Sequence, residues 1–521
     1  MLVIFLIVAP LVAAVLMAAL PSRNLPSLCY ETIHMASVVL VCALSCYLAF
    51  VATTGRGIAI YALGGWFCLD ALGAVFIFLI GAIGLLTGWH SLSQIRHDLN
   101  EGVFTPSPLK QYYVFFNLFV FTMLTVALSN NIIMMWAAVE ATTLATVFLI
   151  GAYNTKLSLE AAWKYVIVCT AGVAFGLYGT LLVYANAADI MPDPHQAIFW
   201  TSLLPYASQF DAMLIQIAFV FVVIGFGTKA GLFPMHTWLP DAYAEAPSSV
   251  SALLSGALSK CAVLIMIRFY TITVGAVGAT FPRMIMTVIG IFSVALAALA
   301  VFRQDDLKRK LAFSSVKNVG IVALCLGFGG PLGVAAALLH CVMHGFTKAL
   351  AFCLSGNILM KYKTRDLTQI KGILEVAPAT AVLMIIGLIA LSGFPPSAMF
   401  VSEVLAFAAG VVSGNIWLVI IFGLALAIVI AAFMLVIARS VIGKAPEAMK
   451  KKDVGIMTLI PEVVIAFVII WFGVAPPQTM IRGIESATEI VMQEEGYVFK
   501  GAPILKDIFT AARSYNGEGA L

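Results

Sequence analysis

The amino-acid sequence predicts an all-α integral membrane protein with about fourteen transmembrane helices. Three observations carry this prediction. Of the 521 residues, 62% are apolar and only 10% are charged, whereas a soluble domain carries about 25% charged residues. The apolar residues form long runs bounded by polar, glycine or proline residues. Lysine and arginine gather in alternate loops, as expected when cytoplasmic loops carry them in excess.

The apolar runs place the expected helices near residues 2–20, 33–52, 69–89, 112–128, 131–151, 160–187, 212–230, 249–270, 282–301, 311–328, 333–358, 379–410, 415–438 and 457–475. The first run is interpreted as a helix and not as a signal peptide, because no positively charged segment precedes its apolar core.

The basic residues test this helix count independently. They lie at Arg23, at 96–110, at Lys156, and in three dense groups at 303–310, 361–371 and 439–452. The intervening loops hold only Arg56 and Arg283. This alternation fits an even number of spans in a prokaryotic inner membrane, with both termini on the outer side.

Two helices are predicted to break at corresponding places. Lys229 is followed by Gly231 and Pro234, and Pro395 and Pro396 interrupt the twelfth helix before Glu403. Paired interruptions beside ionisable residues are typical of inverted repeats with sites near the membrane midplane. The predicted organisation is three N-terminal helices at 1–111, a five-helix repeat at 112–270, an inverted five-helix repeat at 282–438, a cytoplasmic loop and last helix at 439–480, and a polar C-terminal tail at 481–521, which either forms a surface helix or is disordered.

Ionisable residues inside the apolar runs are few. Each costs at least ~2.5 kcal/mol at the bilayer centre, so each is a functional candidate. They are Glu140, Lys164, Lys229, Lys260, Lys317, His340, His344, Lys348 and Glu403. Lys164 and Lys317 are weaker candidates because they lie near the predicted cytoplasmic ends, where a lysine can extend to water. We expect Lys317 to extend to water in this way. For Lys164 the sequence leaves both interpretations open, extension to water or a functional role.

His340, His344 and Lys348 follow one another at intervals of four residues, which places them on one helix face at roughly 6 Å intervals. Histidine accepts and donates protons near neutral pH, and burial favours neutral lysine. The pattern predicts a proton relay. The alternative is that these side chains only hydrogen-bond to neighbouring helices.

Glu140 and Lys229 predict an ion pair whose opening would favour deprotonation of the lysine. A purely structural pair is the alternative. Glu403, after the second break, is predicted to be the terminal proton acceptor and donor, unless it extends to the outer surface.

The sequence shows no pattern for a bound cofactor. Its nine cysteines include no CxxC pair and no Cys/His cluster at metal-ligand spacing, so we interpret them as buried apolar side chains. Phosphate-binding and dinucleotide-binding glycine motifs are absent from the sequence, and the net charge of +4 gives no reason to expect nucleic acid. We therefore expect no cofactor and no metal in this chain.

Six motifs, in order along the chain, resemble the proton-channel subunits of respiratory complex I and the related cation/proton antiporters. They are WAAVE at 136–140, the stretch 225–260, QDDLKRKLAFSS at 304–315, HCVMHGFTK at 340–348, TRDL at 364–367 and SGFPPSAMFVSE at 392–403. Strings at 112–131, 161–188 and 329–340 resemble the hydrogenase 4 branch of these proteins, from membrane-bound nickel–iron hydrogenases of the formate hydrogenlyase type. The resemblance covers roughly residues 1–480.

The resemblance implies a role for each matching residue. It makes Glu140 and Lys229 the channel ion pair, Lys260 the connecting lysine, and Glu403 the terminal group that some members replace by lysine. It makes His340, His344 and Lys348 the central relay. It also implies partners: other membrane subunits, including a quinone-site-like one, and a peripheral redox arm that holds the nickel–iron centre and the iron–sulfur clusters.

The expected function is therefore a proton-translocating, antiporter-like subunit of a redox-driven membrane-bound hydrogenase complex. The chain would belong to an oxidoreductase complex without holding a redox centre itself. The alternatives are a sodium/proton antiporter subunit, a channel subunit of a complex I-type NADH-quinone oxidoreductase, and an inorganic-carbon uptake subunit. The absence of any cofactor motif argues against a quinone- or hydrogen-reacting enzyme.

Overall fold

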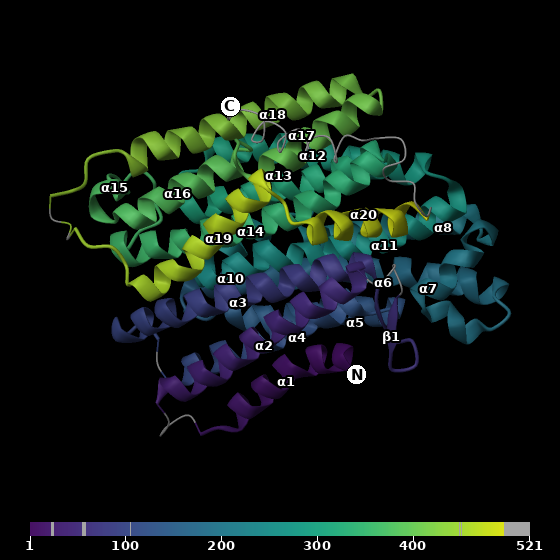
Figure 1. Ribbon diagram of the computed structural model, residues 1–521, viewed down its shortest axis with the longest axis horizontal. Coiled ribbons are helices and arrows are strands. Elements are labelled where there is room, and N and C mark those ends of the chain that lie inside the picture. The colour runs from purple at the N-terminus through teal and green to yellow at the C-terminus, as the bar shows by residue number, and fades with distance from the viewer. Residues whose placement is uncertain (22–25, 55–58, 105, 448, 450, 494–521) are drawn as a thin grey trace, which may run out of the picture.

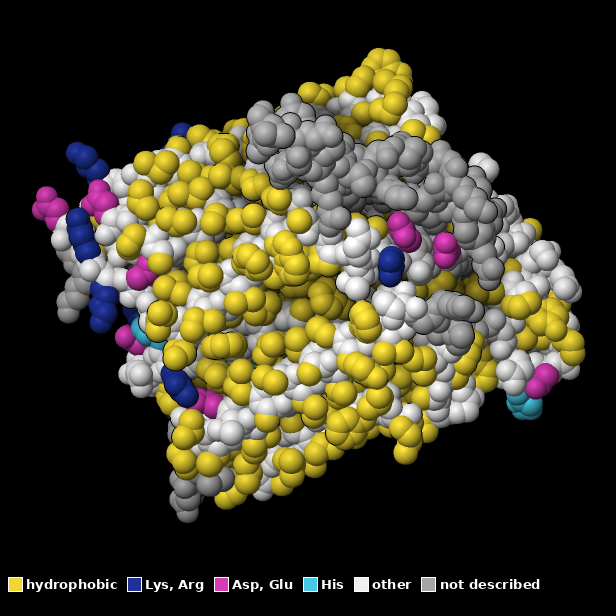
Figure 2. All heavy atoms as spheres, viewed as in Figure 1, with side chains coloured by type: hydrophobic (Ala, Val, Ile, Leu, Met, Phe, Trp, Pro, Cys, Tyr) yellow, Lys and Arg dark blue, Asp and Glu magenta, His cyan; other side chains and the backbone are white. Residues whose placement is uncertain are grey.

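The computed structural model describes residues 1–521 except 22–25, 55–58, 105, 448, 450 and 494–521. The protein is a bundle of long helices that run back and forth between two ends (Figure 1). Apolar side chains cover most of the visible face, and lysine and arginine gather at one end, on the left in Figure 2. We call this the basic end; it includes the loops after α3, α5, α12, α14 and α18.

Thirteen helical passages in the described part of the chain are long and apolar enough to cross a bilayer. The first seven are α1 (Leu2–Ala19), α2 (Ser27–Thr54), α3 (Ala71–Asn100), α4 (Pro106–Leu128), α5 (Ile132–Ile150), α6 (Lys156–Ile190) and α8 (Ala212–Ala230). The next six are α10 (Ser248–Leu253) continuing into α11 (Ser259–Val277), then α12 (Thr280–Arg303), α13 (Leu307–Phe328), α14 (Gly330–Tyr362), α18 (Ile416–Val436) and α19 (Ile456–Val474).

Two shorter apolar helices, α16 (Pro378–Leu391) and α17 (Ala398–Val412), together make the fourteenth passage. The predicted all-α membrane fold is thus confirmed, and the protein is a multi-pass integral membrane protein. The remaining elements are the hairpin of β1 (Ile60–Ala62) and β2 (Phe67–Leu69), the short helices α7 (Trp200–Leu203), α9 (Leu239–Glu245) and α15 (Ile373–Val376), the single turns η1 (Pro194–Ile198), η2 (Leu204–Gln209), η3 (Leu254–Leu258) and η4 (Ile437–Val441), and α20 (Gln478–Met492).

Several helices are longer than the apolar runs predicted, because a helix can continue into polar sequence once it has begun. The third was predicted to end near residue 89, but α3 runs to Asn100. It begins where the Asp70 side chain accepts a hydrogen bond from the Gly73 backbone N–H at 2.7 Å. The polar extension brings further residues of α3 into the bundle at the basic end.

Both predicted helix breaks are present. α8 ends at Ala230 because Gly231 adopts a left-handed conformation with φ of 87°, and the chain becomes helical again only at Leu239. α16 ends before Gly393, where φ is 70°, and Ser397 caps the start of α17. The eighth predicted helix, near residues 249–270, contains the turn η3, which is π-helical, a feature common at functional sites.

The helices that carry most ionisable candidates lie in the middle of the bundle (Figure 1). The most apolar stretches of α14 and of the Ser248–Val277 passage are entirely buried by other helices, and that of α13 is 94% buried. Those of α1, α6 and α12 are only 39% buried and face outwards. Polar groups on α11, α13 and α14 are therefore shielded from lipid by protein, the condition under which a membrane tolerates them.

The C-terminal tail differs from its prediction at its start. The predicted boundary at residue 480 falls inside α20, which packs against α2, α3 and α14 of the same chain. Its buried face is formed by Gly483, Ile484, Ala487, Thr488 and Val491. Residues 494–521 of the predicted tail lie outside the described residues, as do Arg23 and Arg56.

Close contact between α6 and α8 depends on facing glycines. A Cβ placed on Gly225 would lie 2.3 Å from the backbone nitrogen of Gly176. We expect Gly225→Val to force the helices apart and lower the free energy of unfolding by about 1–3 kcal/mol or more. Thermal unfolding of the purified protein measures this. Gly455→Val is the matched control because a Cβ there meets no atom within 4 Å; equal melting temperatures would contradict the role of the close contact.

Candidate functional site

The predicted site residues lie on five helices, α5, α8, α11, α14 and α17. Glu140 is half-buried, and the other six are buried: Lys229, Lys260, His340, His344, Lys348 and Glu403. Their polar contacts group them into three clusters, described in turn below.

The first cluster surrounds Lys229 at the C-terminal end of α8, where the helix dipole favours a cation. Its Nζ donates hydrogen bonds to Thr143 Oγ1 at 2.7 Å and to the Tyr165 hydroxyl at 2.6 Å. Thr143 Oγ1 donates in turn to Glu140 Oε2 at 3.3 Å, and Thr170 Oγ1 donates to Glu140 Oε1 at 2.8 Å. In the described structure Lys229 thus reaches Glu140 through a hydroxyl.

The predicted Glu140–Lys229 pair is therefore not a direct contact in the described structure. The physical reason is the bridging Thr143, whose hydroxyl accepts from the lysine and donates to the carboxylate. A hydroxyl that does both can pass a proton by exchanging its donor and acceptor roles.

The second cluster surrounds Lys260, which follows the π-helical turn η3. Its Nζ donates to the Ser255 carbonyl and to Ser259 Oγ, the latter at 3.1 Å. Ser255 Oγ lies 2.8 Å from Ser315 Oγ, which links η3 to α13. The same turn touches α14, because a Cβ on Gly256 would lie 3.1 Å from the Gly345 carbonyl oxygen. Lys260 is thus held at the junction of α11, α13 and α14.

The third cluster runs along α14. The rings of His340 and His344 stack with centroids 6.0 Å apart and an interplanar angle of 15°. Lys348 Nζ donates to Ser314 Oγ and to the Leu311 carbonyl, both on α13. The predicted common face is present, and it is turned towards α13. His344 differs from its neighbours because neither ring nitrogen has a hydrogen-bond partner in the described structure.

The relay face of α14 continues to Glu403. His340 Nδ1 lies 2.9 Å from Ser402 Oγ, and His340 Nε2 lies 3.2 Å from Asn318 Oδ1. Glu403 Oε1 accepts a hydrogen bond from Lys317 Nζ at 3.3 Å. A Cβ on Gly393 would lie 1.8 Å from Glu403 Oε2, so only glycine leaves room for this carboxylate at the break.

Two expectations about this cluster are corrected. Lys317 does not extend to water: its side chain is 1% exposed and paired with Glu403. The alternative that Glu403 reaches the outer surface also fails, because its side chain is 5% exposed. A sequence signal for Lys317 was available, since Ser314, Lys317 and Asn318 are spaced to share one face of α13.

Comparison with known proteins agrees with this arrangement. The family model described as NADH:quinone oxidoreductase/Mrp antiporter, TM, matches residues 129–430. The chain belongs to this family. It is 38% identical to the Hydrogenase-4 component F homolog of Methylacidiphilum infernorum (isolate V4) over 342 residues, covering 66% of this chain and 72% of that protein.

Solved structures of respiratory complexes share the fold. A chain of an archaeal membrane-bound sulfane sulfur reductase superimposes with a TM-score of 0.84 at 24% identity, over 95% of this chain and 99% of that one. A chain of respiratory complex I from Thermus thermophilus gives a TM-score of 0.78 at 20% identity, over 95% and 100% of the two chains. The fold of this NADH:quinone oxidoreductase/Mrp antiporter family member is therefore that of membrane subunits of multi-subunit complexes.

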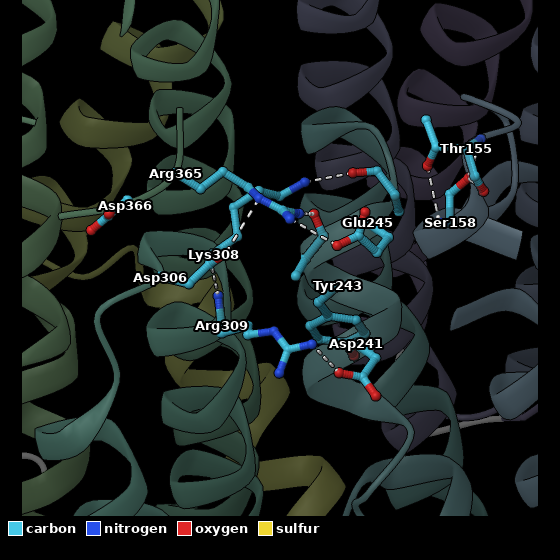
Figure 3. Close-up of polar contacts among 12 residues, drawn as sticks. Thr155, Ser158, Asp241, Tyr243, Glu245, Asp306, Lys308, Arg309, Arg365 and Asp366 are labelled. Atoms are coloured by element: carbon cyan, nitrogen blue, oxygen red, sulfur yellow. Dashed lines mark hydrogen bonds and ion pairs between the residues drawn. The ribbon is translucent and has the colours of Figure 1, made fainter. Parts of the chain in front are cut away.

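Three of the family-like motifs converge at the basic end and not at the relay. Figure 3 shows Asp241 and Glu245 of α9 facing Arg309 and Arg365. Asp241 pairs with Arg309 and Lys164, and Arg365 pairs with Glu245 at 2.8 Å and with Asp306 at 3.3 Å. Lys164 is 43% exposed and belongs to this network, which ties the segment after the α8 break to α13.

Sequence reasoning missed other buried ionisable residues. Asp70 and Arg268 form a buried pair at 2.9 Å near the end opposite the basic end. His90 and Glu462 form another at 3.3 Å, with both side chains 0% exposed. His90 and Asp70 fell at the edges of the predicted third helix, where a polar residue looks like a helix end. No group of three His, Cys, Asp or Glu side chains in the described residues could hold a metal ion.

The buried Lys317–Glu403 pair can be tested by a double-mutant cycle. We expect Lys317→Met alone to destabilise the protein by about 3–5 kcal/mol if Glu403 stays ionised, because one charge is left unpaired, and Lys317→Met/Glu403→Gln to recover most of the loss. Thermal unfolding of the purified protein gives the coupling energy.

The Lys451–Glu375 pair is the matched control. It has the same separation of 3.3 Å, but its side chains are 67% and 45% exposed. The equivalent substitutions there should give a coupling of about 0–1 kcal/mol. Equal coupling in both pairs would mean that Lys317 and Glu403 are not buried together.

Proposed function

We propose that this chain is the proton-translocating, antiporter-like subunit of a redox-driven membrane-bound hydrogenase complex of the formate hydrogenlyase type. The observation that carries the proposal is the series of proton-exchanging groups from Lys229 through Lys260 and α14 to Glu403, whose side chains are all buried by protein. The likeness to a Hydrogenase-4 component F homolog supports the hydrogenase branch. The alternatives keep the same fold. In one the chain is a complex I subunit with other partner subunits, and in the other it belongs to an antiporter that exchanges sodium for protons.

The direction of transport follows from the basic end. Loops rich in lysine and arginine face the cytoplasm in most membrane proteins, so we assign the basic end to that side. Met1 then lies on the outer side, since the N-terminus is at the other end of the bundle in Figure 1. Protons enter near Glu140 and Lys229, pass Lys260 and the α14 relay, and leave towards the outer side through Glu403.

The charge pattern suggests how the route is switched. In the first predicted five-helix repeat the acid Glu140 is on the second helix and the base Lys229 is on the fourth. In the second repeat the base Lys317 is on the second helix and the acid Glu403 is on the fourth. When positive charge moves away from Glu140 towards Lys260, it repels the positive charge on the next base along the proposed route. This repulsion is strong at low dielectric and favours loss of a proton from that base.

Each hand-over uses groups of this chain. Thr143 and Tyr165 hold the Lys229 ammonium while it is charged. Neither His344 nitrogen has a hydrogen-bond partner in the described structure, so one can receive a proton from Lys260 while the other releases one to His340 or Lys348. Ser402 and Asn318 orient His340, so its imidazole can deliver a proton towards Glu403. In this proposal the nickel–iron centre and iron–sulfur clusters reside in partner subunits and supply the driving reaction.

Replacing Lys229 tests the proposal. We expect Lys229→Ala, in the whole complex reconstituted into vesicles, to abolish proton pumping and to leave most of the electron transfer. The reason is that the uncharged site can neither hold nor release a proton. The measurement is acidification of the vesicle interior per electron transferred, with Lys371→Ala as the control because Lys371 is exposed in a loop at the basic end.

Full pumping by the Lys229→Ala complex would refute the channel assignment. Sodium-dependent transport that persists without an electron donor would instead favour the antiporter alternative. A large nickel–iron subunit co-purifying with this chain would support the hydrogenase branch, and its replacement by NADH-oxidising subunits would overturn that branch while keeping the transport function.

A further inference from the structure

A second group of buried polar side chains, two of them ionisable, lies between α3, α14 and α19, on the side of α14 that does not face α13. It consists of His90, Asn357 and Glu462, each 0% exposed. Asn357 is on the same helix as the relay, nine residues after Lys348. None of the three contributes to the route proposed above.

The three side chains are arranged to hold one proton. Asn357 Nδ2 donates to Glu462 Oε1 at 2.9 Å and to Oε2 at 2.8 Å. His90 Nε2 lies 3.3 Å from Glu462 Oε1 and 3.3 Å from Asn357 Oδ1. A buried pair of this kind is electrically neutral when it carries a single proton, either on the imidazole beside a carboxylate or on the carboxyl beside a neutral imidazole.

Polar groups line a path from the basic end towards this pair. Tyr153 donates to Asp98 Oδ2 at 2.9 Å, and Gln94 Nε2 donates to the Tyr153 hydroxyl at 3.2 Å. Gln94 Oε1 accepts from the Ser249 backbone at 3.1 Å, and Ser249 Oγ lies 2.8 Å from the Tyr112 hydroxyl. Asp98 is near the C-terminal end of α3 and only half-buried, so the path begins at the basic end.

The pair and the path meet at the start of α10. His90 Nδ1 and Ser248 Oγ are buried, and neither has a hydrogen-bond partner in the described structure. Both side chains lie against Gly356: a Cβ there would be 2.9 Å from Ser248 Cβ and 3.4 Å from His90 Cε1. One water between the two would satisfy both atoms.

From Ser248 the same passage leads to the relay. Serines recur along α10, η3 and α11. Ser255 of η3 and Ser259 of α11 contact Lys260, whose Nζ donates to the Ser255 carbonyl and to Ser259 Oγ. The pair therefore lies at the basic-end beginning of a serine-bearing passage that also carries Lys260.

We propose that His90 and Glu462, held by Asn357, form a proton reservoir that fills from the basic end along α3 and reprotonates Lys260 by way of α10. The inference rests on the proposed proton-translocating function. In each cycle the His90 Nδ1 proton leaves towards Ser248, and His90 Nε2 takes up a proton from Glu462. A proton arriving along the Asp98 path at the start of α10 returns to His90 Nδ1, and His90 Nε2 gives its proton back to Glu462, so the net change is the passage of one proton.

Two titratable groups outside the pair act on it electrostatically in the described structure. They are Cys353 on α14, which acts on His90, and Asp453 before α19, which acts on Glu462. Further away, His34 of α2 lies against Gly88, and Asp98 of α3 acts on Tyr112 of α4. The hydrogen-bonding neighbour Asn357 is neutral.

Glu462→Gln tests the reservoir in the reconstituted complex. The amide keeps an acceptor for Asn357 and a contact with His90, but it cannot hold the proton. We expect normal protons pumped per electron at low electron flux and a ratio that falls to roughly half or less at high flux, because Lys260 is reloaded too slowly. His90→Gln should behave in the same way. Glu31→Gln is the matched control, since Glu31 is also buried beside α3 but pairs with Arg96.

The outcomes separate this inference from the main proposal. If Lys229→Ala stops pumping while Glu462→Gln and His90→Gln pump like the unmodified complex at every flux, only the reservoir is overturned. If Lys229→Ala pumps normally, the proposed function itself fails. Failure of both variants to assemble while Glu31→Gln assembles would identify the pair as a structural tie and would also overturn the reservoir.

Discussion

Charged and titratable side chains inside a bilayer are destabilising unless protein replaces the water that they lose, and this constraint organises the whole molecule. α11, α13 and α14 carry most such groups, and the other helices surround these three almost completely. Three lysines in the interior find oxygen acceptors on a neighbouring helix: Lys229 on α5 and α6, Lys348 on α13, and Lys317 on α17. The acceptors are mostly hydroxyls, which bind a charged lysine without preventing its deprotonation.

The helix breaks serve the same constraint. A regular helix satisfies its own backbone groups and offers nothing to a buried ion, whereas a helix end offers free carbonyls or N–H groups. Lys229 lies at such an end, Glu403 lies against Gly393 at the other break, and Lys260 follows a π-helical turn whose Ser255 carbonyl it contacts. Backbone irregularity therefore coincides with all three clusters, and the ion network at the basic end connects the first break to α13.

Much of this could be predicted from the sequence, because hydropathy and loop charges report directly on the membrane. The fourteen passages, both breaks and the shared face of His340 and Lys348 follow from spacing alone. The predictions that failed were those that depend on which helices are in contact. Lys317 was expected to reach water because its depth was judged from one helix, and the bridging role of Thr143 cannot be predicted without knowing that the Lys229 side chain reaches α5. His90 was missed because polar residues that prolong α3 look like the end of a span.

In the proposed function, the interior groups of α14 carry protons and do not merely hold helices together. His344 separates the two roles best, because neither of its ring nitrogens makes a hydrogen bond in the described structure. Proton pumping per electron by reconstituted complex carrying His344→Phe is the most direct measurement. We predict normal assembly and electron transfer with pumping lost. Pumping at the unmodified ratio would show that protons do not pass along α14.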